Sequence, residues 1–248
     1  MTLAGRRVLI TGGGTGLGAD LARGFAAAGA EVVVAGRRRE PLDAVTTRAP
    51  GTIAIVADVT DEASVVRLFA AAGPIDVVVA NAGAAESAPL SRTSLELWQQ
   101  MLAVNLTGVF LTLRQGVRQM EGRGWGRLIT VASTAGLKGY AYVAAYTAAK
   151  HGAVGLTRAV AQEVAGAGIT ANALCPGYLD TEMTERTIAN IMATTGRSHD
   201  DALKALMRTN PQGRLVQPAE VTAAALWLCG PGSDAINGQA IAIDGGEL

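Results

Sequence analysis

Apolar residues along the chain follow two alternating patterns. Short runs rich in β-branched residues, several of them continuously apolar, predict strands at residues 7–11, 31–35, 52–56, 77–80, 127–131, 170–175 and 240–243. Longer alanine-rich segments with helical periodicity lie between them, at residues 16–28, 40–47, 63–72, 94–121, 144–164 and 219–228. Continuously apolar strands are typical of parallel sheets that are covered on both faces. The alternation therefore predicts an α/β fold, with a doubly wound parallel sheet of about seven strands and helices on both faces.

One long segment interrupts this rhythm. Between Pro176 and Pro218 we predict no strand, only short polar helices near residues 184–192 and 198–207. The ligand crevice of an open α/β sheet lies beyond the carboxyl ends of its strands. We therefore expect an insert at about residues 179–208 to close over that crevice. Because no linker or internal repeat divides the chain, residues 1–248 are predicted to form a single domain that both binds a cofactor and carries catalysis.

Composition and charge exclude several classes of function. The 248 residues carry 21 Lys and Arg against 21 Asp and Glu, so charge gives no reason to expect a nucleic-acid or membrane partner. No apolar run approaches the roughly 18 residues of a membrane span, and the N-terminus lacks a signal-peptide pattern. Cys175 and Cys229 lie in apolar runs and are expected to be buried free thiols. We predict a cytoplasmic protein with no metal site.

A glycine-rich turn follows the first predicted strand. It reads Thr11-Gly12-Gly13-Gly14-Thr15-Gly16-Leu17-Gly18 and leads directly into a helix. Glycine permits the tight turn and lets backbone N–H groups approach a pyrophosphate at the positive helix N-terminus. A Gly-x-Gly-x-x-Ala pattern from Gly14 also matches formally, but it begins too far beyond the strand. The sequence thus predicts a Rossmann-type dinucleotide site that uses Gly12, Thr15, Gly16, Leu17 and Gly18.

The end of the second strand indicates which dinucleotide binds. An acidic residue there usually holds the ribose 2′-OH of NAD, whereas an arginine suits the 2′-phosphate of NADP. Here the acidic position is Gly36, and Arg37 and Arg38 follow it. We therefore predict NADP(H). The competing interpretation of residues 37–39 is a solvated charge run, which is what we expect of Arg39.

Two further strand ends carry candidate cofactor residues. Asp58 and Val59 follow the third strand, and Asp58 can accept a hydrogen bond from an adenine amino group or serve only as a turn residue. Asn81, Ala82 and Gly83 follow the fourth strand. We expect Asn81 to bridge strand ends, and Gly83 to let the backbone pass close to a ribose.

The candidate catalytic residues are Asn105, Ser133, Tyr146 and Lys150. The i,i+4 spacing of Tyr146 and Lys150 places both on one helix face, where an ammonium and a positively charged nicotinamide would lower the phenol pKa. Tyr146 can then exchange a proton with a substrate oxygen while a hydride moves at the adjacent carbon. Ser133 ends a strand and can donate to the same oxygen. Asn105 is a poor helix former in a helical segment, and we expect it to distort that helix and hold a water near Lys150.

Taken in order, these motifs resemble the short-chain dehydrogenase/reductase superfamily over essentially the whole chain. The resemblance rests on the glycine turn, Asn81-Ala82-Gly83, the four catalytic candidates, Pro176-Gly177 and Asp244-Gly245-Gly246. It implies that Leu179 and Thr181, after Pro176 and Gly177, contact the nicotinamide carboxamide, and that Tyr146 and Lys150 also contact the cofactor. It further implies a homotetramer assembled through the helices at residues 94–121 and 144–164. Two departures are Ala80, where many members have Asn, and Thr15, where several NADPH-using members have Arg.

We expect a ketone or secondary alcohol as the substrate. Flanking residues around Lys150 and Pro176 are similar to the branch with 3-oxoacyl thioester reductases, 3-hydroxyacyl dehydrogenases and polyketide ketoreductases. A 3-oxoacyl substrate is thus one possibility. Substrate specificity lies in loops 84–92, 134–143 and 179–208, whose side chains do not identify the substrate. The alternatives are an NAD-preferring secondary alcohol or 3-hydroxyacyl dehydrogenase and a non-catalytic NADP(H) sensor, which has no need of Ser133 and Tyr146 together. A nucleic-acid binder lacks stacking residues, since the aromatic content is 4%.

Overall fold

The computed structural model describes residues 2–248, which form a seven-stranded parallel sheet. The strand order is β3-β2-β1-β4-β5-β6-β7, so the chain starts in the middle and winds outward in both directions. Every pairing between neighbouring strands is parallel. The strands are β1 (Arg7–Thr11), β2 (Glu31–Gly36), β3 (Ile53–Val56), β4 (Val77–Ala80), β5 (Gly126–Val131), β6 (Ile169–Pro176) and β7 (Ala240–Ile243).

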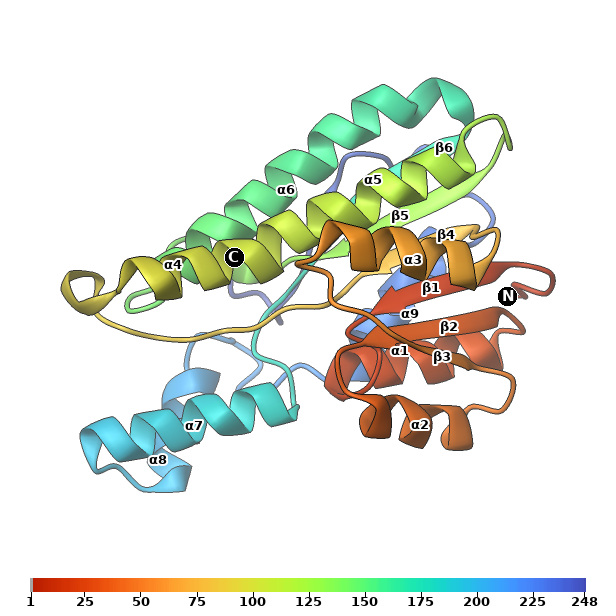
Figure 1. Cartoon of the computed structure of the whole chain (residues 1–248). Coiled ribbons are helices and arrows are strands. Elements are labelled where there is room, and N and C mark those ends of the chain that lie inside the picture. The colour runs from red at the N-terminus through yellow and green to blue at the C-terminus, as the bar shows by residue number, and fades with distance from the viewer. Residues whose placement is uncertain (1) are drawn as a thin grey trace.

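Helices cover both faces of the sheet (Figure 1). One face carries α1 (Gly16–Ala27), α2 (Arg39–Arg48) and α9 (Pro218–Leu228). The other carries α3 (Glu62–Ala72), α5 (Gly108–Met120) and α6 (Ala144–Val164), with α4 (Leu95–Leu102) leading into α5. The remaining helices, α7 (Glu182–Thr195) and α8 (His199–Met207), project beyond the sheet.

Alternation along the central strand divides the core between these two faces. Val8 and Ile10 of β1 pack towards α1 and α9, whereas Leu9 between them packs towards α3, α5 and α6. All three side chains are fully buried. Because successive strand residues point to opposite faces, a continuously apolar strand requires helices on both sides. The buried pattern of β1 and β4 therefore accounts for the three-layer architecture.

The predicted elements are confirmed, with two corrections. The seven strands fall within one or two residues of their predicted ranges. The helix predicted at residues 94–121 is instead divided into α4 and α5 by a π-helical turn, η2 (Ala103–Thr107). The segment between Pro176 and Pro218 forms α7 and α8 as expected, but it also contains one parallel bridge between Leu179 and Val216. That bridge ties the start of this segment to its end.

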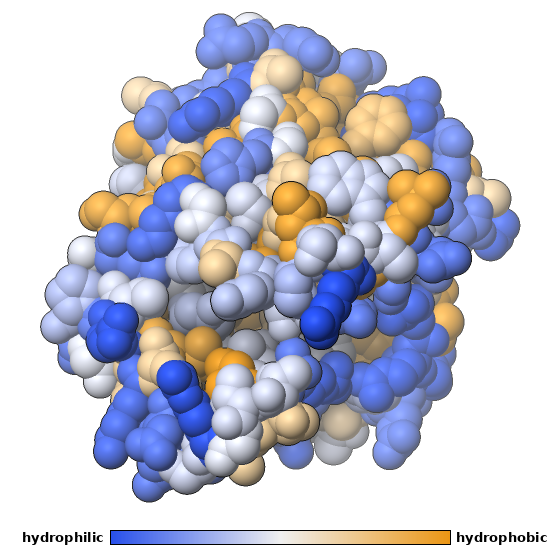
Figure 2. All heavy atoms as spheres, turned by 90° about the vertical axis from the view of Figure 1, so that its left-hand side faces the viewer, coloured by the Kyte–Doolittle hydropathy of each residue, from blue (hydrophilic) through white to orange (hydrophobic). Residues whose placement is uncertain are grey.

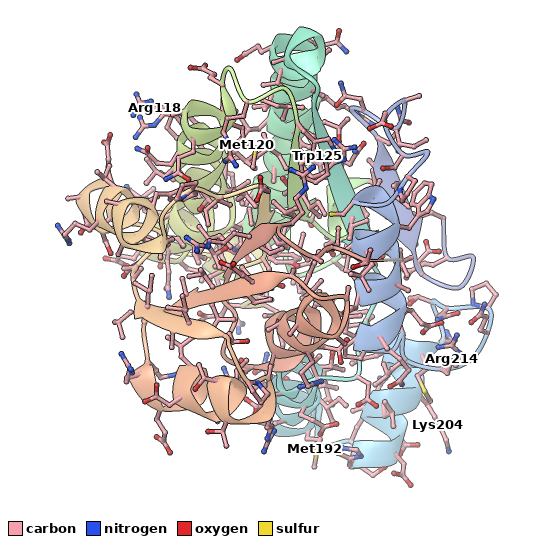
Figure 3. The ribbon with its side chains drawn as sticks, turned by 90° about the vertical axis from the view of Figure 1, so that its right-hand side faces the viewer. Arg118, Met120, Trp125, Met192, Lys204 and Arg214 are labelled. Atoms are coloured by element: carbon pink, nitrogen blue, oxygen red, sulfur yellow. The ribbon has the colours of Figure 1, made fainter. Side chains whose placement is uncertain are left out.

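The two ends of the sheet differ in character. At the amino ends of the strands, the guanidinium groups of Arg6 and Arg127 lie over the ring of Trp125, 3.8 and 4.5 Å from its centroid. Figure 3 shows this end of the sheet and labels Trp125. Arg127 is fully buried, and it pairs with Asp234 and donates to the carbonyl of Leu228. Removal of one of these partners would leave a buried charge uncompensated and destabilise the fold. The candidate site residues lie at the opposite, carboxyl ends, the side that Figure 2 faces.

Candidate functional site

The glycine turn joins β1 to α1 and leaves the start of the helix open. A Cβ atom on Gly18 would overlap the carbonyl oxygen of Gly12, so only glycine fits there. Gly12 and Gly16 have φ values of +65° and +50°, which favour glycine. Thr15 is the N-cap of α1 but makes no side-chain cap hydrogen bond, and the first turn has no acidic residue. Unpaired N–H groups and the positive helix end therefore suit an anionic pyrophosphate.

Thr11 and Asn81 join the ends of β1 and β4, as predicted for Asn81. The Asn81 amide donates to the carbonyl oxygens of Thr11 and Gly12 at 2.9 and 3.2 Å. The Thr11 hydroxyl accepts from the backbone N–H groups of Asn81 and Ala82, both at 3.1 Å. These bonds hold the glycine turn against the next strand end. Sequence reasoning did not assign Thr11 this role.

Arg37 and Arg38 line a hollow at the end of β2. Its volume is about 120 Å³, and its other walls include Gly12, Gly14, Thr15 and Gly36. Both arginines are exposed. Arg39 instead pairs with Asp43 at 2.8 Å on the surface of α2, in line with its predicted solvated role.

Asp58 is both a turn residue and a neighbour of Arg37. Its carboxylate accepts from the N–H and hydroxyl of Thr60 at 2.9 and 2.7 Å. Burial acts to raise the pKa of Asp58, but the two Thr60 bonds and the charge of Arg37 outweigh it and lower the pKa. The turn role is thus present, and the positive charge of Arg37 lies close enough to act on the Asp58 carboxylate. Val59 is buried beside it and packs near Gly108 of α5.

Asn105 lies at the centre of the π-helical turn, which confirms the predicted distortion. Its side chain is fully buried, and its amide donates to the carbonyl oxygens of Ala84 and Met101 at 2.9 and 3.0 Å. Its Oδ1 accepts from the Ala84 N–H at 3.2 Å. A Cβ on Gly83 would lie 2.9 Å from that Oδ1 and 3.7 Å from Lys150 Nζ. Asn105, Gly83 and Lys150 are therefore neighbours, although they lie far apart in sequence.

Ser133, Tyr146 and Lys150 meet where β5 ends and α6 begins. The Ser133 hydroxyl lies close enough to the Tyr146 phenol to lower its pKa. Lys150 is almost fully buried and donates from Nζ to the carbonyl oxygen of Val131 at 2.8 Å. Its Nζ lies 5.6 Å from the centre of the Tyr146 ring. Burial lowers the pKa of Lys150 to about 8.

Burial raises the pKa of Tyr146 to about 12, which acts against the lowering expected from the sequence. The neighbouring Ser133 hydroxyl only partly opposes this rise. The Lys150 ammonium donates to Val131 O. A neutral phenol beside Ser133 is a proton donor at neutral pH. That state suits the reduction of a carbonyl group.

The end of β6 carries the last group of predicted cofactor residues. Pro176 is buried in the strand, and Gly177 donates its N–H to the carbonyl oxygen of Ile243 in β7. Leu179 makes the single bridge to Val216. Thr181, the N-cap of α7, lies over the glycine turn, since a Cβ on Gly16 would be 3.4 Å from its methyl group. The segment that starts α7 therefore borders the same crevice as the glycine turn.

Sequence reasoning missed a second polar cluster at the crevice. Tyr140 and Lys138, between Ser133 and Tyr146, both contact Glu247 near the end of the chain. No local sequence pattern predicts this contact, because the residues are more than 100 positions apart. The only sequence signal is the preceding Asp244-Gly245-Gly246, which had been assigned no chemistry.

Comparisons with known proteins agree with this arrangement. The family model for short chain dehydrogenase matches residues 6–191. The gluconate 5-dehydrogenase of Gluconobacter oxydans is 36% identical over 253 residues, covering 99% of this chain and 95% of that protein. The 3-oxoacyl-(acyl-carrier-protein) reductase MabA of Mycobacterium bovis is 35% identical over 246 residues, covering 97% and 92%. A crystal structure of a variant of actinorhodin polyketide ketoreductase with NADPH is similar with a TM-score of 0.92 and 34% identity, covering 98% of this chain and 97% of that one. From its glycine turn to its Tyr146–Lys150 pair, the chain belongs to the short-chain dehydrogenase/reductase family.

Proposed function

We propose that this oxidoreductase transfers a hydride between NADP(H) and a ketone or secondary alcohol, with Asn105, Ser133, Tyr146 and Lys150 as its catalytic residues. The observation that carries the proposal is the meeting of Ser133 and Tyr146 beside a buried lysine, next to an open helix N-terminus. A protein that only sensed the cofactor would need the helix terminus but not the paired hydroxyls. The bound nicotinamide would supply or accept the hydride.

The side chains divide the proton chemistry between them. In the reductive direction, the Tyr146 phenol donates its proton to the carbonyl oxygen as negative charge develops there. The Ser133 hydroxyl donates a second hydrogen bond to the same oxygen. The Lys150 ammonium favours the phenolate that remains. Asn105 keeps the helix open at η2, where a water can return a proton towards Lys150.

We assign each remaining group of predicted cofactor residues to one part of the dinucleotide. We assign the pyrophosphate to Gly12, Thr15, Gly16, Leu17 and Gly18, and the 2′-phosphate to Arg37 and Arg38. We assign the adenine to Asp58 and Val59, and the ribose to Asn81, Ala82 and Gly83. Pro176, Gly177, Leu179 and Thr181 would hold the nicotinamide, within reach of Tyr146 and Lys150. The hollow beside Arg37 supports this direction of binding.

Binding measurements test the preference for NADP(H). A charge-assisted hydrogen bond to a phosphate contributes about 1.5–3 kcal/mol, so we expect about 10- to 100-fold tighter binding of NADPH than of NADH. A Cβ on Gly36 would meet Leu42 only at 3.5 Å, so Gly36→Asp fits without displacing the strand. Gly36→Asp combined with Arg37→Ala should reverse the preference. Equal affinity for both cofactors in the wild-type protein, measured by fluorescence at low salt, would show that Arg37 is only a solvated charge.

The substrate class is proposed as a 3-oxoacyl thioester. The similarity to a reductase named for 3-oxoacyl-(acyl-carrier-protein) supports it, as does the likeness to a polyketide ketoreductase. A gluconate 5-dehydrogenase is equally similar, which makes polyols and sugar acids the necessary comparison set. The test is a spectrophotometric screen of NADPH oxidation over acyl thioesters, aryl ketones, cyclic ketones and keto-sugars. Turnover of keto-sugars alone would overturn the thioester assignment.

The oligomeric state of the protein is also a proposal. We keep the homotetramer, and two exposed apolar residues on a helix segment expected at its interface support it: Leu95 and Phe110. Analytical ultracentrifugation tests this assembly.

No helix among the described residues is long and apolar enough to cross a membrane. A reducing cytoplasmic setting is supported by the buried, unpaired Cys175 and Cys229. We also keep the single-domain organisation, with residues 179–208 as the substrate insert.

A further inference from the structure

Residues 134–143, which we call the crevice loop, connect the two proposed proton donors. Ser133 stands immediately before this loop, and Tyr146 lies three residues after it. The Ser133 hydroxyl also accepts from the N–H of Ala135, so the loop and the catalytic hydroxyl share one local structure. Any movement of the crevice loop therefore changes the wall that a substrate must pass to reach Tyr146.

Glu247 holds this loop from the far end of the chain. Its side chain is only 2% exposed, although it lies next to the last residue. Its Oε1 accepts from the Tyr140 hydroxyl at 2.5 Å and pairs with Lys138 Nζ at 3.0 Å. Burial of an unpaired carboxylate would be costly, so both contacts are needed to keep Glu247 inside.

The contact continues through Tyr140 to the catalytic end of the loop. The Tyr140 hydroxyl is also 2.7 Å from the Thr134 hydroxyl, and Thr134 follows Ser133 directly. Burial and the Glu247 carboxylate raise the pKa of Tyr140 well above its ordinary value, so its proton stays on the phenol. A continuous set of polar contacts thus runs from Glu247 through Tyr140 to Thr134.

The residues Asp244, Gly245 and Gly246 form the turn that positions Glu247. The Asp244 carboxylate accepts from the N–H groups of Gly246 and Leu248 at 3.0 and 3.1 Å. Gly245 and Gly246 have φ values of +69° and +94°, and a Cβ on Gly245 would overlap the Asn210 side chain. The turn brings Glu247 Oε2 to the backbone of Gly177, where a Cβ would lie 3.5 Å away. Glu247 therefore joins the crevice loop to the end of β6.

We propose that Glu247 is a positioning residue of the substrate crevice, which holds the crevice loop through Tyr140 and Lys138 and thereby sets the affinity for the carbonyl substrate. This rests on the proposed function, because it assumes that the substrate oxygen lies at Ser133 and Tyr146. Glu247 holds the crevice loop through Tyr140 and Lys138, whereas it meets the assigned cofactor residue Gly177 only by the proximity of its Oε2. Its effect should therefore appear in the KM of the substrate and not in NADPH affinity.

Hydrogen exchange tests the positioning without any substrate. In Glu247→Gln, which keeps an acceptor for Tyr140 but loses the charge paired with Lys138, we expect exchange at the amides of Leu137 and Lys138 to rise about fivefold or more. Exchange in β4 should not change. The matched control is Glu121→Gln, at an exposed carboxylate after α5. Unchanged exchange in the crevice loop of Glu247→Gln would overturn the proposal, whatever the enzyme turns over.

Kinetics then test the consequence for substrate binding. We expect about a tenfold rise in KM for Glu247→Gln, with kcat within about threefold of wild type and NADPH affinity unchanged. Tyr140→Phe should raise KM similarly, and the double variant should add little to either, because both act through one contact. A fall in kcat with unchanged KM, or full additivity of the two substitutions, would assign Glu247 a purely structural role. Failure of the wild-type protein to oxidise NADPH with any ketone would instead count against the proposed function.

Discussion

Lys150 is a buried cation whose removal should stabilise the protein while abolishing its proposed activity. Its ammonium has one hydrogen-bond acceptor, Val131 O, and only 3% of the residue is exposed. Burial lowers the Lys150 pKa from 10.5 to about 8. At about 1.4 kcal/mol per pKa unit, the charged form costs the folded state about 3 kcal/mol. Lys150→Met removes that cost, but loss of the hydrogen bond destabilises the folded state by about 1 kcal/mol. We therefore expect the free energy of unfolding to rise by about 2 kcal/mol.

The sign of this effect depends on pH in a defined way. Below pH 8 the lysine is protonated in both states, and the full cost is present. Between pH 8 and 10.5 only the unfolded chain keeps the proton, so wild-type stability rises with pH relative to the variant. The advantage of Lys150→Met should therefore shrink through this window and reverse before its upper end, where only the lost hydrogen bond of about 1 kcal/mol remains.

Urea unfolding without cofactor, followed by circular dichroism at several pH values, measures this difference. The control is Lys204→Met on α8, at an exposed side chain. A Lys150→Met protein that is less stable than wild type near neutral pH, or a difference that does not change with pH, would refute the reasoning.

Three further predictions concern the site and the insert. Tyr146→Phe should keep the fold and NADPH affinity but lower kcat by about 100-fold or more, since it removes the proton donor; retention of half the wild-type rate would contradict the assignment. Gly18→Ala should destabilise the protein and weaken NADPH binding in calorimetry, because its methyl group overlaps Gly12 O, whereas Gly155→Ala, with open space around its Cβ position, should do neither. Amides of residues 179–208 should exchange faster than those of β4 without ligand, and equal protection in both segments would argue against a mobile insert.

The sequence by itself determined the architecture and the identities of the proposed site residues. Runs such as the buried Val77–Ala80 allow only a strand covered on both faces, so the parallel sheet followed from local patterning. The glycine turn and the Tyr146–Lys150 spacing are likewise local, since each lies within a few residues of chain. Even the distortion at Asn105 was foreseeable, because asparagine fits a regular helix poorly.

Only the tertiary structure decided how these residues act on one another. The Tyr146 pKa depends on burial and on the neighbouring Ser133 hydroxyl, and neither follows from an i,i+4 spacing. The contact of Glu247 with Tyr140 joins residues that are 107 positions apart, so no periodicity encodes it. It arises because β5, β6 and β7 are neighbours in a parallel sheet, whose carboxyl ends bring distant loops to one edge. Short segments of sequence therefore determine which residues form the proposed site. The pKa values of those residues and the shape of the substrate crevice depend on how the strand ends assemble at one edge of the sheet.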